Sequence, residues 1–504
     1  MLLIAIDRKP YNSVDLFTRM KVVTSSKAVE SVVDEALVIP IFEGVKPSKD
    51  LSKDLQKALL NKDFKAEQYE VYLSYHESFK SKRVIYVSLG KEESVTLEKI
   101  RRAYHQVQKK LNSLKIKSFS LSLPKTKLKL EEVTDAILTS ILLSNYRFDK
   151  YKSDDKDKGT RFSQITVLDD NPKLKNVIDH AVIVAKGANF VRDLANENAR
   201  DKTSLILEDI ARKTAKENKL KITVFDEKDL KRLGMNLLLA VGAGAVTPPR
   251  LIVLEYHGNP SSKDVYSFVG KGIIFDSGGL NLKPTGSIED MRADMTGAAT
   301  VLGLLRVASQ LKIKANLVGV MAVCENAISN GAYKPGDIFR SYSGKTVYIG
   351  NTDAEGRLIL ADALSYSIKK YKPKLTVDMA TLTGAAVVAV GTKISAILGN
   401  NEKAINNIIS SGKKVGENFH ELPLFEDYNE LMKNNLADIS NISSEKFGPG
   451  TITAALFLQN FVDNQPWVHL DIAGPAFISS EYHYVGPQAT GVCVRTLINF
   501  LENI

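Results

Sequence analysis

Two short blocks of the sequence concentrate the acidic and basic side chains that a paired divalent-metal site requires. Both blocks, residues 269–295 and 351–358, are rich in glycine and border apolar runs, and their charged residues include Lys271, Asp276, Lys283, Asp294, Asp353, Glu355 and Arg357. Charged groups in an apolar setting are costly unless they are paired or bind a metal. Two divalent ions about 3.5–4 Å apart can hold a hydroxide between them and polarise a substrate oxygen. We therefore expect the four acids to converge on a pair of ions.

The spacing of the acids is suited to such a site. Asp353 and Glu355 are two residues apart, so in an extended segment both side chains would project to one face. The following glycine permits a turn into a helix that Arg357 begins. Asp276 precedes a Ser-Gly-Gly bend, which lets the backbone approach a metal or substrate closely. Asp294 stands just before another expected helix.

Each residue taken alone has an ordinary structural explanation. Asp294 could cap a helix, and Asp353 could stabilise a turn. Lys271 could lie on the surface, and Arg357 could form an ion pair. Taken together, these explanations require four carboxylates to gather by chance beside two apolar strand ends, so the combined pattern favours a metal site.

Signatures of other sites are weak. Gly242-Ala243-Gly244 lacks the third glycine of a dinucleotide fingerprint, and the glycines around Lys271 lack P-loop spacing. No nucleophile elbow, catalytic triad or HExxH motif occurs. His469 and Trp467 lie in an apolar run, and we expect both to be core residues.

Bulk properties favour a soluble, cytoplasmic protein. The chain has 504 residues, of which 44% are hydrophobic and 25% charged. No apolar run is long enough to span a bilayer. Residues 1–6 are too short for a secretory signal and are typical of a first β-strand. Only Cys324 and Cys493 occur, which suits a reducing cytosol.

The net charge of +10 is unevenly distributed. Residues 1–180 hold 33 Lys and Arg against 25 Asp and Glu, whereas residues 181–504 hold 35 against 33. This basic excess is compatible with a nucleic-acid surface. Because the lysines are interspersed with acids, the pattern is more typical of a solvated face.

The order of predicted elements divides the chain into two α/β domains. Residues 1–172 form a smaller N-terminal domain, in which strands at 84–89 and 118–123 flank a helix at 97–111. An exposed loop at 150–158 and a linker to about residue 172 follow. Residues 173–504 form a larger domain that opens with a linking helix at about 174–198.

The larger domain is predicted to contain a mainly parallel central sheet covered by helices on both faces. Its expected strands are nearly continuous apolar runs, as buried parallel strands are, at 251–254, 265–269, 316–321, 375–379 and 468–472. Helical patterns such as 298–311 and 360–371 lie between them. Ligands of such sheets bind beyond the carboxyl ends of strands, and Lys271 is expected directly after the strand at 265–269.

The motifs resemble those of the leucyl (cytosol) aminopeptidase family of two-metal peptidases. The octapeptide at 351–358, NTDAEGRL, agrees with the family's most diagnostic motif without a change. Further agreement covers the block around Lys271, and the segments at 291–295, 380–385, 450–455 and 469–474. The resemblance extends from about Arg192 to Arg495. One departure is Asn198, where the family pattern leads us to expect proline.

The resemblance implies a role for each charged residue. Asp276 and Glu355 would bridge two divalent ions. Lys271 and Asp294 would complete the coordination of the more exchangeable ion, and Asp353 would complete that of the other. The ions would be Zn²⁺ or Mn²⁺, with Mg²⁺ or Co²⁺ as alternatives, and a hydroxide between them would attack the peptide. As a ligand, Lys271 must be neutral, which requires a lowered pKa. Lys283 would polarise the scissile carbonyl, and Arg357 would hold a bicarbonate that acts as the base.

The resemblance also implies a substrate and an assembly. A free amino group bound at the exchangeable ion would confine cleavage to the N-terminal residue. The pocket for that residue, apolar and suited to leucine, would comprise Met291, Thr381, Leu382, Gly384 and Ala473. Family members are homohexamers with inward-facing sites, which favours short peptides. Two other functions remain open: DNA binding by the basic N-terminal domain, as in some relatives, and two-metal phosphoester hydrolysis.

Overall fold

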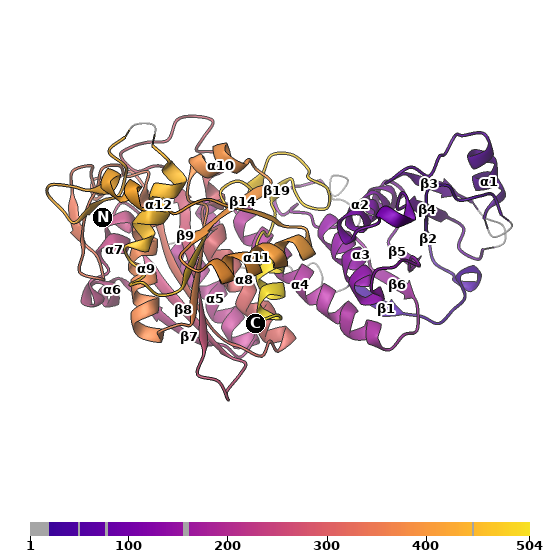
Figure 1. Cartoon of the computed structure of the whole chain (residues 1–504), viewed down its shortest axis with the longest axis horizontal. Coiled ribbons are helices and arrows are strands. Elements are labelled where there is room, and N and C mark those ends of the chain that lie inside the picture. Colours follow the sequence, from indigo (N-terminus) through magenta and orange to yellow (C-terminus); the bar gives the residue numbers. More distant parts are fainter. Residues whose placement is uncertain (1–19, 49–50, 76–78, 155–160, 446–447) are drawn as a thin grey trace.

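The computed structural model describes residues 20–48, 51–75, 79–154, 161–445 and 448–504. These residues form two α/β lobes that meet around a long helix, α4 (Figure 1). The strand predicted at residues 1–6 lies outside the described residues. None of the described helices is long and apolar enough to cross a membrane.

The smaller lobe contains a six-stranded sheet in the order β1-β6-β5-β2-β4-β3, parallel except for the β3–β4 pair. Its strands are β1 (Lys21–Thr24), β2 (Ala36–Ile41), β3 (Val71–Ser74), β4 (Val84–Ser88), β5 (Ser118–Ser122) and β6 (Gln164–Leu168). Its helices are α1 (Lys53–Leu60), α2 (Leu97–Ser113) and α3 (Leu130–Ser144). The prediction of a linker up to residue 172 was wrong, because β6 lies inside it. Ile165 and Val167 alternate with polar residues and are fully buried, so this short segment pairs as a strand between β1 and β5.

The linking helix is confirmed within two residues as α4 (Lys173–Asn196). It ends where Glu197 takes an extended backbone conformation, with φ −61° and ψ 145°. Helix α4 contacts α3 of the smaller lobe and α8 (Thr296–Leu311) of the larger lobe. The predicted domain boundary between residues 172 and 173 falls at the start of α4.

The larger lobe contains an eight-stranded sheet in the order β15-β14-β17-β13-β9-β10-β8-β7. The four central strands are parallel, which confirms the predicted fold class, whereas the strands that join at each side run antiparallel. The strands are β7 (Lys221–Phe225), β8 (Arg250–His257), β9 (Val265–Asp276), β10 (Asn316–Asn326), β13 (Leu375–Ala380), β14 (Ile394–Gly399), β15 (Asn418–Glu421) and β17 (Trp467–Asp471).

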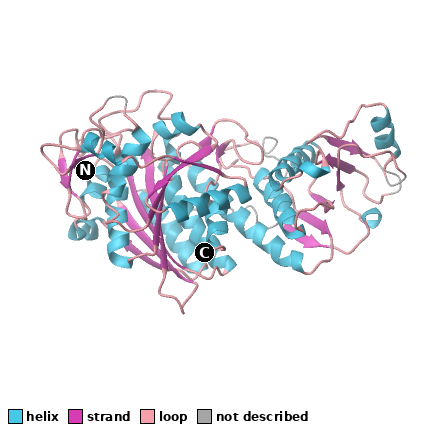
Figure 2. Ribbon diagram, in the orientation of Figure 1, coloured by secondary structure: helices cyan, strands magenta, loops and turns pink. Residues whose placement is uncertain are grey.

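Helices cover both faces of this sheet (Figure 2). Successive residues of β10 alternate between two apolar cores: Met321 and Val323 belong to the core that includes α8, and Val320 and Ala322 to the core that includes α9. The helices are α5 (Ser204–Glu217), α6 (Glu227–Leu233), α7 (Asn236–Gly242), α8, α9 (Glu355–Tyr371), α10 (Gly384–Val390), α11 (Glu402–Val415), α12 (Gly450–Gln459) and α13 (Val494–Leu501).

The two aromatic residues predicted for the core are fully buried on β17. Trp467 Nε1 donates to Asp378 Oδ2 at 2.6 Å, and His469 Nδ1 lies 2.6 Å from Asp378 Oδ1. Asp378 and His469 are register partners on β13 and β17. These buried hydrogen bonds therefore link the central strands β13 and β17.

One strand boundary differs from the prediction in a way that matters for the site. Strand β9 continues beyond residue 269 to Asp276, so Lys271 lies inside the strand and Asp276 ends it. The prediction stopped the strand at the Gly-Lys-Gly sequence, because charge and glycine usually end one. Here Gly270 is required by packing, since a Cβ there would lie 2.6 Å from the carbonyl oxygen of Gly297.

Candidate active site

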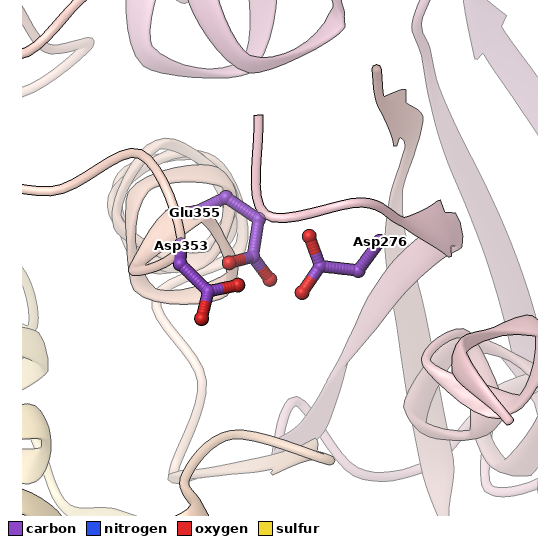
Figure 3. Close-up of side chains that lie close together, drawn as sticks. All are labelled: Asp276, Asp353 and Glu355. Atoms are coloured by element: carbon purple, nitrogen blue, oxygen red, sulfur yellow. The ribbon is translucent and has the colours of Figure 1, made fainter. Parts of the chain in front are cut away.

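Three carboxylates converge at the carboxyl end of β9. Asp276 approaches from the strand, while Asp353 and Glu355 approach from the turn before α9 and its first residue, and the three side chains point toward one another (Figure 3). One ligand oxygen from each lies within 4.8 Å of the others. The segment that carries Asp353 and Glu355 is a turn and a helix start, not the extended segment that we predicted. The turn nevertheless directs both carboxylates to the same place.

Lys271 joins a fourth carboxylate to this group. Its Nζ lies 2.8 Å from both oxygens of Asp294 and 2.8 Å from Glu355 Oε1. Nζ also donates to the carbonyl oxygen of Thr381 at 2.8 Å. Glycine is needed at position 356, because a Cβ there would lie 2.5 Å from Lys271 Cε. The two sequence blocks thus pack directly against each other.

Lys283 reaches the opposite side of the carboxylate group. Its Nζ lies 2.9 Å from Asp276 Oδ2 and 2.6 Å from Asp353 Oδ1. The bend predicted after Asp276 makes this return possible: Gly278 and Gly279 have φ of 87° and 64°, and Lys283 N donates to the Ser277 carbonyl at 3.0 Å. All four acids and both lysines therefore lie in one site.

Burial and repulsion from neighbouring carboxylates raise the pKa values of Asp294, Asp353 and Glu355. Burial and the nearby Asp276 raise the pKa of Glu355 to about 8, and burial raises the pKa of Asp294 to about 6. Burial of Lys271 acts against its charge, but the surrounding carboxylates outweigh it and raise the pKa of Lys271. A neutral Lys271 ligand requires a lowered pKa, whereas the carboxylates around Lys271 raise it. A dication beside Lys271 would have to reverse this shift.

The donors of the site fit divalent ions. Asp294 Oδ2, Asp353 Oδ1 and Glu355 Oε1 are buried and accept no aligned hydrogen bond from the described residues, although an ammonium group lies within 2.8 Å of each. Buried carboxylate oxygens in native proteins ordinarily have an ion, water or donor as partner. Four carboxylates with one amine are a donor set suited to divalent ions.

Arg357 lies on the first turn of α9. Nη1 donates to the carbonyl of Asn441 at 2.7 Å, while the buried Nε has no hydrogen-bond partner in the part of the chain that the structure describes. Burial lowers the pKa of Arg357 to about 10. A buried guanidinium with unused donors is suited to a planar anion.

The residues predicted for the substrate pocket lie on three segments around the acids. Met291 begins the short helix Met291–Ala293 before Asp294, Thr381 and Leu382 follow β13, Gly384 begins α10, and Ala473 follows β17. Thr381 Oγ1 donates to Asp294 Oδ1 at 2.6 Å, so its segment is attached to the acids. Met291, Thr381, Leu382 and Ala473 are half-buried, and Gly384 is exposed.

Two asparagines that the sequence analysis did not identify hold the acidic segments. Asn326 Nδ2 donates to Asp276 Oδ1 at 2.8 Å and to the Thr352 carbonyl at 3.0 Å. Asn441 accepts from Gly350 N at 2.8 Å and donates to the Asn351 carbonyl at 2.7 Å. A polar residue ending the apolar strand β10 was a usable signal for Asn326. Asn441 is remote in sequence and carried no such signal.

Comparison with known proteins decides the family. The family model for the catalytic domain of the cytosol aminopeptidase family matches residues 189–498, and the model for its N-terminal domain matches residues 38–155. The chain belongs to the cytosol aminopeptidase family. Membership makes it a metal-dependent aminopeptidase, which agrees with the acidic group at the end of β9.

Individual relatives resemble this chain along most of its length. A probable cytosol aminopeptidase of Protochlamydia amoebophila (strain UWE25) is 36% identical over 481 residues, covering 93% of this chain and 96% of the relative. A probable cytosol aminopeptidase of Geobacter sp. (strain M21) is 41% identical over 425 residues, covering 84% and 86%. The structure of the bottromycin maturation enzyme BotP in complex with Mn superposes with a TM-score of 0.84 at 31% identity, covering 94% of this chain and 99% of BotP.

Proposed function

We propose that this aminopeptidase uses two divalent ions to release leucine-like residues from the N-termini of short peptides. Five residues would hold the ions: Asp276 and Glu355 shared between them, Lys271 and Asp294 at one, and Asp353 at the other. The supporting observation is the convergence of the acids and two lysines on one buried site. The similar BotP structure with Mn supports Mn²⁺ as one ion that such a site accepts, with Zn²⁺, Mg²⁺ and Co²⁺ as alternatives.

The residues around the acids have distinct proposed roles. When bound, the ions would supply an activated water-derived nucleophile and polarise the substrate carbonyl. Lys283, held between Asp276 and Asp353, carries a positive charge that can stabilise the negative charge developing on the carbonyl oxygen. Arg357 can hold a bicarbonate through its free guanidinium donors, and that anion would serve as the base.

In this proposal the N-terminal residue of the substrate determines how the peptide binds. The free amino group would sit among the acids near Asp294, so that only the first peptide bond reaches Lys283. The side chain of the substrate's N-terminal residue would enter the pocket formed by Met291, Thr381, Leu382, Gly384 and Ala473. One methylene in such a pocket contributes only about 1–3 kcal/mol, so the preference for leucine is graded. We further propose a cytoplasmic homohexamer, following the family resemblance.

A panel of aminoacyl amides with metal replacement tests this proposal. The protein should cleave leucyl amide faster than glycyl amide, lose activity with a chelator and regain it with Mn²⁺ or Zn²⁺. Glu355→Ala should lower kcat by several orders of magnitude. Glu402→Ala, which removes the carboxylate of the first residue of α11 just as Glu355→Ala does for α9, should leave kcat unchanged. Near-normal turnover by Glu355→Ala, or cleavage of a phosphate ester in place of an amide, would refute the proposal.

A second role in nucleic-acid binding is favoured by the charge of residues 1–180, with 33 Lys and Arg against 25 Asp and Glu. The exposed lysines at positions 125, 127 and 129 offer a direct test. Mobility shift of duplex DNA should occur at low salt, weaken as salt rises, and disappear when all three lysines become Glu. Glu355→Ala should leave the shift unchanged. Absence of a shift at low salt would remove this role.

A further inference from the structure

A buried carboxylate joins two of the segments that carry the proposed substrate pocket. Asp471 is the last residue of β17 and is 1% exposed. Its register partner on the parallel strand β13 is Ala380, which ends that strand. The segments that follow β13 and β17 therefore leave the sheet side by side, with the Asp471 side chain between them.

The Asp471 carboxylate accepts three hydrogen bonds from these segments. Oδ1 accepts the backbone N–H of Leu382 at 3.2 Å and that of Ala473 at 3.1 Å. Oδ2 accepts the hydroxyl of Thr383 at 2.7 Å. Its hydrogen bonds thus go to the backbone and to a hydroxyl of the pocket segments, and the carboxylate also interacts electrostatically with the Arg357 guanidinium.

Thr383 extends the connection to two helices. Its only hydroxyl proton goes to Asp471, so the contact with Thr451 at 3.0 Å has Thr451 as donor. The Thr383 oxygen also accepts Ala386 N at 3.0 Å and caps α10. Asp471 therefore also fixes where α10, and with it Gly384, begins.

The same segment is held from the other side by the acidic site. Lys271 Nζ donates to the carbonyl of Thr381, and the Thr381 hydroxyl donates to Asp294 Oδ1. Residues 381–383 are thus anchored at one side to the proposed metal ligands and at the other to Asp471. Moving the Asp471 anchor would alter the pocket with less effect on the acids.

We propose that Asp471 is a positioning residue that sets the shape of the pocket and thereby the preference for large over small N-terminal residues. The inference rests on the proposed function, which assigns Leu382 and Ala473 to that pocket. Without the carboxylate, two partly buried N–H groups and a buried hydroxyl lose their partner, and the segments are expected to move to satisfy them. The fit of a single methylene changes kcat/KM by about 10- to 200-fold, so small displacements alter selectivity.

The test measures kcat/KM for leucyl and glycyl amides in Asp471→Ala and Asp471→Asn. Asp471→Ala should lower the leucyl-to-glycyl ratio by about tenfold or more, because glycine has no side chain in the pocket. Asp471→Asn keeps an Oδ1 acceptor for both N–H groups and loses only the acceptor for Thr383, so it should retain most of the ratio. A merely structural role would lower both rates together and leave the ratio unchanged.

Asp362→Ala is the matched control. Asp362 is also fully buried, and its hydrogen bonds among the described residues come from the backbone N–H groups of Leu237 at 3.0 Å, Leu238 at 3.1 Å and Tyr342 at 2.8 Å, none of which lies in a pocket segment. Its leucyl-to-glycyl ratio should equal that of the parent even if its stability falls. Should Asp471→Ala fail to fold, Asp471→Ser decides by the same ratio, because its shorter side chain also lacks the Oδ1 acceptor of the Leu382 and Ala473 N–H groups.

The outcomes separate the two claims. A parent enzyme that prefers leucyl amide, together with an unchanged ratio in Asp471→Ala, overturns the inference and leaves the proposed function standing. A parent that cleaves no aminoacyl amide overturns the proposed function and this inference with it. A ratio that falls in Asp471→Ala, recovers in Asp471→Asn and is unchanged in Asp362→Ala establishes the positioning role.

Discussion

Replacing Lys283 by Met is expected to lower kcat for leucyl amide by about 100- to 1000-fold. The Lys283 side chain is 15% exposed, and its Nζ lies 2.9 Å from Asp276 Oδ2 and 2.6 Å from Asp353 Oδ1. A single preorganised donor in such a water-poor site contributes about 2.7–4 kcal/mol to transition-state stabilisation. Because about 1.36 kcal/mol corresponds to a tenfold change in rate, the expected loss is two to three orders of magnitude.

Steady-state kinetics with leucyl amide, together with the metal content of the purified variant, test this prediction. Metal content should stay at the parent value, because Lys283 is not among the proposed ligands. KM should change little if Lys283 acts mainly in the transition state. Lys374→Met, which removes an exposed lysine paired with Asp264 at 2.6 Å, is the control. A kcat within threefold of the parent, or a loss of metal that accounts for the loss of rate, would refute the reasoning.

Two further predictions concern stability. Asp378→Asn should lower the free energy of unfolding by about 2–4 kcal/mol in urea denaturation, because one of the two donors on Trp467 and His469 loses a charged acceptor; an unchanged midpoint would contradict this role. Although burial opposes its charge, two carboxylates raise the pKa of His180 to about 10. Its charge therefore stabilises the fold fully below an unfolded pKa of about 6.5, and this contribution disappears as pH rises through about 10. After allowance for the 33% exposure of its side chain, we expect the His180 charge to contribute about 1 kcal/mol to the free energy of unfolding. Between pH 7 and 10 the parent should therefore lose more stability than His180→Gln. Parallel profiles of unfolding free energy against pH would exclude the effect.

The charged blocks could be read from the sequence because their chemistry is local. Glycines beside acids, and apolar runs that end in polar residues, identify the ends of buried parallel strands without knowledge of the fold. The linking helix was equally readable, since its periodic pattern is long. Lys271 was misplaced because local rules end a strand at Gly-Lys-Gly, whereas in the fold Gly270 allows α8 to pack closely on β9 and Gly272 lies against the backbone of β10.

Long-range contacts could not be predicted from local patterns. Strand β6 is only five residues long, and its neighbours β1 and β5 are distant in sequence, so it was interpreted as a linker. Asn441 holds the turn before α9 from about 90 residues away. The role of Asp471 depends on its register opposite Ala380, which becomes visible only once the sheet is assembled.

The central claim is that Asp276, Asp353 and Glu355, with Lys271 and Asp294, hold a pair of divalent ions. Calorimetric titration of the chelator-treated protein with Mn²⁺ tests it most directly, because it measures binding without relying on turnover. We predict two ions per chain for the parent, and weakened or lost binding of both in Glu355→Ala, whose carboxylate lies among the others. Binding of Mn²⁺ by Glu355→Ala with the parent's stoichiometry and affinity would contradict the account.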